Sequence, residues 1–357
     1  MEADHILYIA YPLLTVSETS AGGAEQVLWT LEREMARRGI ETTVAASSGS
    51  RVSGELFTTG EPCTRNDDFE RRNREHQDAI IEFVRQRSRE GRAFDLVHDM
   101  SGSFWSRATE IDIPVLATLH LPRHFYPAAL FENIPANVMF NCVSESQDRS
   151  FADMPQLAGV VPNGIDLDRF SPNYGKRDGL LLWLGRICEE KGPHAALDIA
   201  EQAGMPIVLA GQVYPFSYHQ QYFEREIQPR LQQNPNARWI DSPSSTMKRD
   251  LLRQSSALLI TSQVDETSSL VAMEAAASGT PVIAFRRGAL QDVVKHEVTG
   301  LLVNNVEEAV KAVPGITQIK NEACRHYALE RLSSARMAED YRSLYARVCK
   351  SKPFVAA

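Results

Sequence analysis

The 357-residue sequence predicts an α/β protein built from two doubly wound parallel-sheet domains. Short apolar runs of strand length alternate with helical segments along the chain, which is the pattern of parallel sheets covered on both faces. Unusual polar residues follow the ends of these runs, and ligands of open α/β sheets bind outside the carboxyl ends of the strands. The length exceeds that of one ordinary domain and suits two.

The first half opens with a strand predicted at residues 5–11. A turn rich in Ser, Thr and Gly follows, and then a helix from about Ala24 to Arg38 that stops at Gly39. Residues 65–92 are read as a loop and a solvated helix, because acidic residues are interleaved with the basic ones. Further strands are predicted at residues 42–46, 96–98, 115–120 and 138–144.

A polar stretch at residues 171–178 is the predicted linker to the second half. We therefore expect a first domain at residues 1–170, a second at 171–333 and a terminal segment at 334–357 whose helix carries an apolar stripe. This stripe is expected to contact the core or the other domain. Strands in the second half are predicted at residues 180–184, 206–210, 237–240, 257–261, 281–285 and 301–303.

The composition, 43% hydrophobic and 24% charged, is that of an ordinary globular protein. A net charge of −8 and a pI near 5.7 argue against a nucleic-acid binder. The five cysteines are scattered without a CxxC pair, which indicates reduced thiols and neither a disulfide framework nor a zinc site. With no visible secretion signal or membrane span, we expect a cytoplasmic protein.

The stretch at residues 264–285 contains the most specific pattern in the chain, two glutamates eight positions apart across a predicted strand–turn–helix boundary. Ser268 and Ser269 are candidate N-caps of the helix that begins near Leu270, so backbone N–H groups and the positive end of the helix dipole would face an anion such as a phosphate. Glu266 lies in the turn and Glu274 within the helix, where carboxylates suit the hydroxyl groups of a sugar and a ribose. The alternative is two surface glutamates on an amphipathic helix.

The two glutamates and the AAASGTPVIAF that follows resemble the donor-site signature of retaining GT-B glycosyltransferases of family 4. Five other segments match that family in its order and extend the resemblance over nearly the whole chain. They are GGAEQ (22–26), VHD (97–99), TLH (118–120), PNGID (162–166) and LGRICEEKG (184–192).

This resemblance implies two Rossmann-like domains that face each other across a cleft. It implies a nucleotide-diphosphate sugar, with UDP or GDP, on the second domain. An acceptor that is a small molecule, a glycan or a lipid-linked compound would bind the first domain. The last helix of the family crosses back onto the first domain. No cofactor and no metal are implied, and the oligomeric state stays open.

Residue roles follow from the same resemblance. Arg186 and Lys191, after a predicted strand and beside Gly185, would neutralise a departing diphosphate; the alternative is a surface cluster with Glu189 and Glu190. The expected catalytic residues are His120, Arg186, Lys191 and Glu266. The expected donor-binding residues are Gly22, Gly23, Gly185, Arg186, Lys191, Gly211, Glu266, Ser268, Ser269, Leu270 and Glu274.

Four of these positions have more specific expectations. Gly22 and Gly23 would let the backbone approach the donor phosphate, although alone they would be a loop. By resemblance, His120 hydrogen-bonds the transferred sugar, and the alternative is a structural histidine. Glu274 would hold the ribose.

The sequence also departs from the family. Residues 267–269 are Thr-Ser-Ser where the family often has Gly-aromatic-Gly, and Asp-Ser-Pro at 241–243 lacks a glycine often found there. The first change affects the sugar pocket and the second the nucleobase contact. A sugar-nucleotide epimerase or hydrolase, or a catalytically silent nucleotide-sugar binder, therefore remain alternatives.

Overall fold

The computed structural model describes residues 3–63, 68–175, 177 and 179–350. The chain forms two compact units: the first runs to Gly164 and resumes at Ser334, and the second is Ile165–Ser333. The sequence placed this division later, after residue 170. It falls earlier because Ile165 and Phe170 already pack into the core of the second unit.

The stretch predicted as a linker is bound to the second unit. The guanidinium of Arg177 donates to the carbonyl oxygens of Ser255 at 2.7 Å and Gly279 at 2.5 Å, and to the hydroxyl of Thr280 at 3.0 Å. Two of its residues, 176 and 178, lie outside the described part of the chain. A charged side chain with this many buried acceptors anchors the segment, so the linker prediction is wrong for this part.

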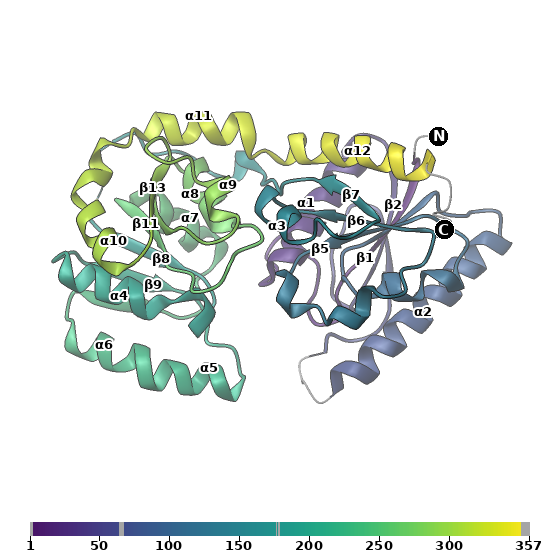
Figure 1. The fold of residues 1–357 in the computed structure, drawn as a ribbon, viewed down its shortest axis with the longest axis horizontal. Coiled ribbons are helices and arrows are strands. Elements are labelled where there is room, and N and C mark those ends of the chain that lie inside the picture. Colours follow the sequence, from purple (N-terminus) through teal and green to yellow (C-terminus); the bar gives the residue numbers. More distant parts are fainter. Residues whose placement is uncertain (1–2, 64–67, 176, 178, 351–357) are drawn as a thin grey trace. The chain divides into compact units, whose positions relative to one another are not determined.

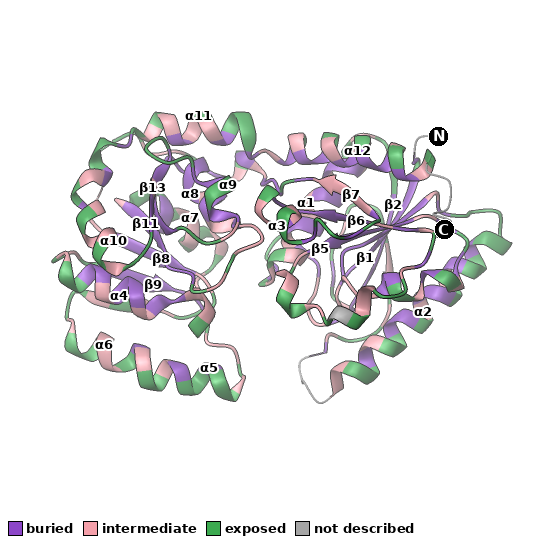
Figure 2. Cartoon of the chain, viewed as in Figure 1, coloured by how far each residue is buried: buried purple, intermediate pink, exposed green. Residues whose placement is uncertain are grey.

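The first unit contains a seven-stranded, entirely parallel sheet in the order β3-β2-β1-β4-β5-β6-β7 (Figure 1). Every residue of β1, β4 and β5 is buried, which is expected of central strands covered on both faces (Figure 2). The strands are β1 His5–Ile9, β2 Glu41–Ala46, β3 Glu55–Thr58, β4 Leu96–Asp99, β5 Val115–Leu119, β6 Val138–Cys142 and β7 Leu157–Val160. The helices are α1 Gly23–Arg37, α2 Phe69–Arg89, α3 Glu145–Ser150 and α12 Ser334–Lys350.

The second unit contains a six-stranded parallel sheet in the order β10-β9-β8-β11-β12-β13. Alternate residues of its strands enter two hydrophobic clusters on opposite faces: Leu182 and Leu258 belong to one, Leu181 and Leu259 to the other. The strands are β8 Leu181–Leu184, β9 Ile207–Ala210, β10 Ala237–Ile240, β11 Ala257–Ile260, β12 Val282–Phe285 and β13 Gly300–Val303. The helices are α4 Pro193–Gln202, α5 Ser217–Tyr222, α6 Gln228–Gln233, α7 Ser245–Gln254, α8 Leu270–Ala277, α9 Leu290–Val293, α10 Val306–Ala312 and α11 Asn321–Arg331.

Both sheets reverse their strand order once, between β1 and β4 and between β8 and β11. Such a reversal leaves a crevice outside the carboxyl ends of the two central strands, where ligands of doubly wound sheets bind. The predicted doubly wound sheets are therefore confirmed, and each has a position suited to a site.

Helix α2 corrects one detail of the sequence-based expectation. It was expected to be solvated, but His76, Ile80 and Val84 are buried on one face. The charged residues that dominate its sequence occupy the other face, so the helix is amphipathic.

Helix α12 belongs to the first unit and contacts its sheet through buried hydroxyl groups. The hydroxyl of Tyr345 lies 2.8 Å from Nδ1 of His98, whose Nε2 lies 2.7 Å from the hydroxyl of Thr118. The hydroxyl of Tyr341 lies 3.3 Å from the hydroxyl of Thr118, and it accepts from the side-chain amide of Asn141 at 3.3 Å. These buried polar groups satisfy one another and fix the position of the helix on the sheet.

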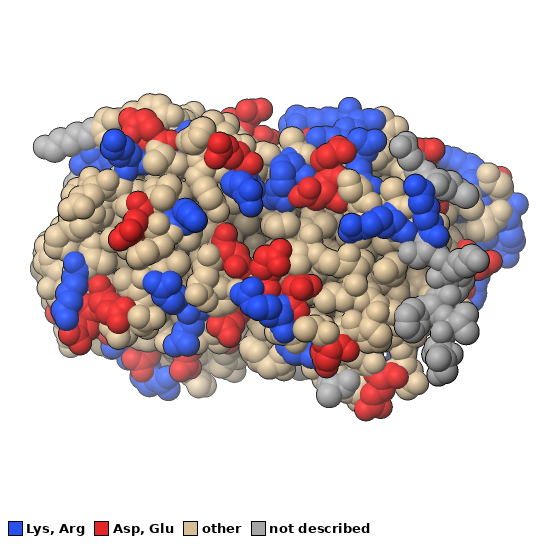
Figure 3. All heavy atoms as spheres, turned by 45° about the horizontal axis from the view of Figure 1, so that its top comes forward, with Lys and Arg blue, Asp and Glu red and all other residues tan. Residues whose placement is uncertain are grey.

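Acidic and basic side chains lie among one another over the face shown in Figure 3. None of the helices in the described residues is long and apolar enough to cross a membrane.

Candidate active site

The loops that follow β8 and β11 meet at the strand-order reversal of the second unit. The ammonium group of Lys191, after β8, contacts both carboxylate oxygens of Glu266, after β11, at 2.6 and 2.7 Å. The Ser262 hydroxyl donates to the same carboxylate. Two residues predicted to be catalytic are thus brought together as an ion pair. The alternative of pairs with neighbouring glutamates is not realised for Lys191.

Hydrogen bonds to backbone carbonyl oxygens hold these two loops in register. The amide of Gln263 donates to the carbonyl oxygen of Glu190 at 2.8 Å, and the hydroxyl of Thr261 to that of Gly192 at 2.7 Å. Gly192 has φ of +62°, and a Cβ there would lie 2.2 Å from the carbonyl oxygen of Thr261. Glycine is therefore required for the close approach of the loops.

Arg186 is the cation of this site that is open to an anionic ligand. Its side chain is exposed, its guanidinium lies 5.5 Å from the ring centroid of Tyr214, and it forms no ion pair within the described residues. Stacking on an aromatic ring orients the planar guanidinium while leaving its N–H groups available. The Lys191 charge, in contrast, is already opposed by Glu266.

Gly185 and Gly211 have a structural role at the same edge. A Cβ on Gly211 would lie 1.7 Å from the carbonyl oxygen of Gly185, and the indole N–H of Trp239 donates to the carbonyl oxygen of Gly211 at 2.8 Å. Their backbones therefore pack directly on each other, and no larger residue fits at Gly211.

Helix α8 begins beside the Glu266 loop, with Ser269 as its N-cap: the Ser269 hydroxyl accepts from the amide of Ala272. The amides of the first turn, which starts at Leu270, have no partner within the helix. The hydroxyl oxygen of Ser268 is buried and has no hydrogen-bond partner in the described residues. An unpaired hydroxyl and free amides at a helix N-terminus favour an anion here.

Glu274 lies in the middle of α8 and is partly buried. Burial raises the pKa of its carboxyl to about 7, although Lys248, Arg169 and Arg249 act in the opposite direction. Its carboxylate has no hydrogen-bond partner within the described part of the chain. A carboxylate with unused acceptor sites is suited to sugar hydroxyl groups.

The remaining predicted residues, His120, Gly22 and Gly23, lie in the first unit. His120 follows β5 and is partly buried; burial lowers the pKa of its imidazole to about 4, so it is neutral near pH 7. Gly22 is the N-cap of α1, and a Cβ there would lie 1.9 Å from Oε2 of Glu25. The buried Glu25 carboxyl thus already occupies the helix N-terminus at which a donor phosphate was predicted.

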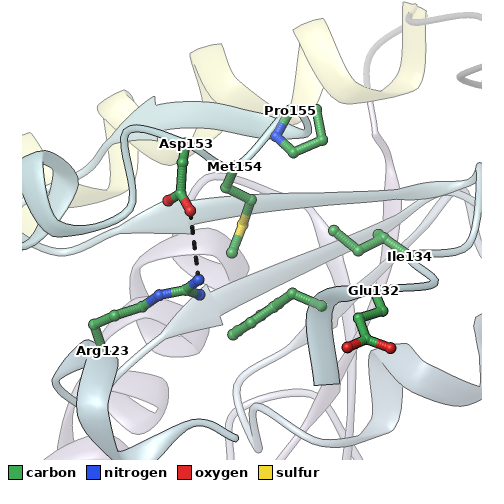
Figure 4. Close-up of a pocket in the computed structure, with 7 residues that line it drawn as sticks. Arg123, Glu132, Ile134, Asp153, Met154 and Pro155 are labelled. Carbon is green, nitrogen blue, oxygen red and sulfur yellow. Dashed lines mark ion pairs between the residues drawn. The ribbon is translucent and has the colours of Figure 1, made fainter. Parts of the chain in front are cut away.

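A pocket of about 160 Å³ also lies in the first unit, in the segments that follow β5 and α3 (Figure 4). Arg123 and Asp153 face each other with nitrogen and oxygen atoms 3.7 Å apart, and Glu132 and Ile134 lie on the opposite side. The guanidinium of Arg123 stacks 4.7 Å from the ring centroid of Phe131, while its Nη1 is buried without a hydrogen-bond partner in the described residues. The pocket therefore combines an aromatic wall with polar groups of both signs.

Comparisons with known proteins agree with this architecture. Residues 21–169 match the model of the family described as Glycosyltransferase Family 4, and residues 165–331 match Glycosyl transferases group 1. The two matches follow each other and together cover most of the chain. The chain belongs to the family 4 glycosyltransferases.

Curated relatives of this glycosyltransferase include two D-inositol 3-phosphate glycosyltransferases. That of Streptomyces bingchenggensis is 27% identical over 314 residues, covering 72% of this chain and 67% of the relative. That of Xylanimonas cellulosilytica is 28% identical over 256 residues, covering 59% and 60%. The matches thus span about two thirds or less of the length of these relatives.

Solved structures confirm the GT-B fold. AviGT4, a glycosyltransferase involved in avilamycin A biosynthesis, is 21% identical with a TM-score of 0.73, and 98% of each chain is covered. HepE of Anabaena in complex with UDP-glucose is 14% identical with a TM-score of 0.73, covering 96% of this chain and 99% of that one.

Several residues that shape the site of this glycosyltransferase were not predicted. Ser262 hydrogen-bonds Glu266, and Gly288 lets the chain after β12 approach Glu266 so closely that a Cβ would lie 2.4 Å from its carbonyl oxygen. Tyr214 supports Arg186. A glycine just after a strand was a usable signal for Gly288, but nothing local in the sequence marks Ser262 or Tyr214.

Proposed function

We propose that this glycosyltransferase is a retaining enzyme that moves a sugar from a nucleotide diphosphate, with UDP or GDP, to an acceptor. The observation that carries the proposal is the grouping, at one edge of the second sheet, of the exposed Arg186 guanidinium, the N-terminus of α8 and the Lys191–Glu266 pair. A diphosphate needs cations and N–H donors, and a sugar needs carboxylates. The complexes of HepE with UDP and with UDP-glucose support this class of donor.

The proposed roles are divided between groups without an ion-pair partner in the described residues and the Lys191–Glu266 pair. Arg186 and the first-turn amides of α8 stabilise the diphosphate as it departs, an electrostatic contribution that is usually the largest in catalysis. Glu274 accepts hydrogen bonds from the ribose. Glu266, held in one orientation by Lys191, accepts hydrogen bonds from the donor sugar, and Lys191 adds charge beside the diphosphate.

Retention is proposed without an enzyme nucleophile. The bond between the anomeric carbon and the diphosphate oxygen breaks, and the acceptor oxygen bonds to the same face of the sugar. The acceptor proton passes to the departing phosphate oxygen. His120 hydrogen-bonds the sugar during this step. Its imidazole is neutral, so it adds no positive charge next to the sugar.

We also propose that the pocket around Arg123 binds a hydroxyl-bearing part of the acceptor. Phe131 stacks on the Arg123 guanidinium and orients it, and this guanidinium and the Asp153 and Glu132 carboxylates suit the hydroxyl groups of a sugar. Arg123→Gln is expected to raise the KM for the acceptor and to leave donor binding unchanged. An unchanged KM would place the acceptor elsewhere.

The overall proposal is tested by incubating the protein with a panel of UDP- and GDP-sugars, with and without acceptors, and by measuring nucleotide release and product stereochemistry. Release that requires an acceptor and yields a retained anomer supports the proposal. Nucleotide release that does not need an acceptor would indicate a hydrolase. Conversion of the nucleotide sugar into its epimer would indicate an epimerase, and binding without turnover would indicate a catalytically silent binder.

A parallel incubation with a chelator tests metal independence. Turnover should persist because Arg186 and the α8 amides supply the positive charge. Loss of turnover that magnesium or manganese restores would contradict the assigned role of these groups.

A further inference from the structure

Three potential metal ligands lie together beside the loop that follows β8. They are the thiol of Cys188, the carboxylate of Glu190 and the imidazole of His219, and their ligand atoms all lie within 4.8 Å of one another. Cys188 and Glu190 come from the loop after β8, whereas His219 comes from α5, which follows β9. The cluster is assembled by the fold from separate segments.

The cluster contains buried polar atoms that the protein itself does not satisfy. His219 is 1% exposed, and both of its ring nitrogens are buried without a hydrogen-bond partner in the described residues. The same holds for Oε2 of Glu190. A bound cation can coordinate the Glu190 oxygen and one of the two His219 nitrogens, so it would supply partners for buried polar atoms that otherwise have none.

We propose that Cys188, Glu190 and His219 bind one thiophilic divalent cation of the zinc class. Thiolate and imidazole select zinc and its neighbours over magnesium or calcium, and three protein ligands leave a fourth tetrahedral position for water. Bond lengths of about 2.0–2.3 Å require ligand atoms about 3.5 Å apart, so small side-chain rotations bring the cluster to that geometry.

The charges near the cluster are compatible with a dication. The thiolate and the carboxylate together balance the two positive charges of the ion, so the neighbouring Arg186 does not face a net positive centre. His219 coordinates as the neutral imidazole. Binding breaks the S–H bond of Cys188, forms the sulfur–metal bond and releases the proton to solvent.

The sequence argued against a zinc site because no CxxC pair is present. A CxxC pair marks sites built from ligands close together in the sequence, whereas here His219 comes from beyond α4 and β9. The inference does not depend on the proposed glycosyl transfer, because the ion is expected to bind without any nucleotide.

Cobalt(II) is the probe, added to the full-length metal-free protein in the absence of nucleotide. We expect visible d–d bands of a tetrahedral ion, a near-ultraviolet thiolate-to-cobalt band, one equivalent bound, displacement by zinc and affinity that rises with pH. Cys188→Ser should abolish the thiolate band. Glu190→Gln and His219→Gln should each weaken binding by more than the about 10- to 100-fold typical of residues that only support a ligand.

Cys349→Ser and His326→Gln are the matched controls, because they remove a thiol and an exposed imidazole elsewhere in the chain. Both should bind cobalt as the unmodified protein does. Near-ultraviolet circular dichroism checks that each variant is folded. The proposal is overturned if no thiolate band forms, if Cys349→Ser removes it, or if folded His219→Gln and Glu190→Gln bind unchanged.

Discussion

Lys191 and Glu266 come from different loops, but their side chains act as one group. The sequence assigned Lys191 to the diphosphate and Glu266 to the sugar. The contacts at 2.6 and 2.7 Å show that the charge of each is opposed by the other before any ligand binds. The pair therefore fixes the orientation of the carboxylate, and Arg186 remains as the cation without an ion-pair partner in the described residues.

Glu274 should make the stability of the ligand-free protein depend on pH. Burial raises the pKa of its carboxyl from 4.5 to about 7, so the folded protein favours the protonated form. Its contribution to stability is present below pH 4.5 and is lost as the pH rises through about 7. Glu274→Gln should therefore increase the free energy of unfolding by about 1–2 kcal/mol near pH 8.5, after allowance for partial exposure, and by less near pH 5.

Urea unfolding of the native protein and of Glu274→Gln at both pH values measures this difference. A variant that is less stable than the native protein near pH 8.5 would mean that the carboxylate is stabilised in the folded state.

His120 should affect turnover more than donor binding. Its neutral imidazole follows β5 in the first unit, and loss of one hydrogen bond made in the transition state should lower kcat by about 100-fold in His120→Ala. Steady-state kinetics together with donor affinity separates the two effects. A structural histidine would instead give an unchanged kcat and a lower Tm.

The sequence predicted the position of this candidate site better than its internal contacts. Glu266 and Arg186 were singled out because they follow predicted strands, and Glu274 because it lies eight positions after Glu266 in a segment that resembles the family. The Lys191–Glu266 pair could not be found, because it joins loops that only the strand order brings together, and the Ser262 contact depends on how the loop after β11 folds back on itself. The Glu25 carboxyl lies in the first turn of α1 beside Gly22, where an acidic residue stabilises the positive end of the helix dipole.

At the scale of elements, α12 is held by its polar contacts as well as its apolar stripe. Tyr345→Phe removes the hydroxyl that contacts Nδ1 of the buried His98 at 2.8 Å and the Tyr8 hydroxyl at 3.3 Å. Leaving a buried nitrogen unpaired should lower the free energy of unfolding by about 1–3 kcal/mol. Chemical denaturation measures the change.

Tyr174→Phe is the control for this substitution, because Tyr174 is 54% exposed. It should change stability by less than about 0.5 kcal/mol. Equal effects of the two substitutions would show that the α12 network contributes nothing beyond packing.

Elements were predictable where burial is complete. The central strands are buried throughout and were placed to within one or two residues. The edge strands β3 and β7, of four residues each, were missed: β3 begins with Glu55 and ends with Thr58, and β7 contains Gly159. Helix α2 was recognised, but its buried face was hidden among charged residues.

At the scale of the whole molecule, each unit has its own sheet, its own core and its own strand-order reversal. The proposed donor contacts concentrate in the second unit, and the proposed acceptor pocket and His120 lie in the first. Substitutions in the second unit of the intact chain therefore test donor binding, and substitutions in the first unit test the acceptor and the transfer step.

The most direct test of the account is calorimetric titration of UDP and GDP, and then of the full donor, into the native protein, Glu274→Gln, Glu266→Gln and the exposed control Glu201→Gln. Hydrogen bonds to charged groups are worth about 1.5–3 kcal/mol, so Glu274→Gln should lower the affinity for UDP or GDP by about 10- to 150-fold. Glu266→Gln should not weaken binding of the bare diphosphate, because its proposed partner is the absent sugar and the change leaves the Lys191 charge unopposed, but it should weaken binding of the full donor. If both variants weaken the diphosphate equally, or neither does, the two glutamates do not read the donor and the central claim is contradicted.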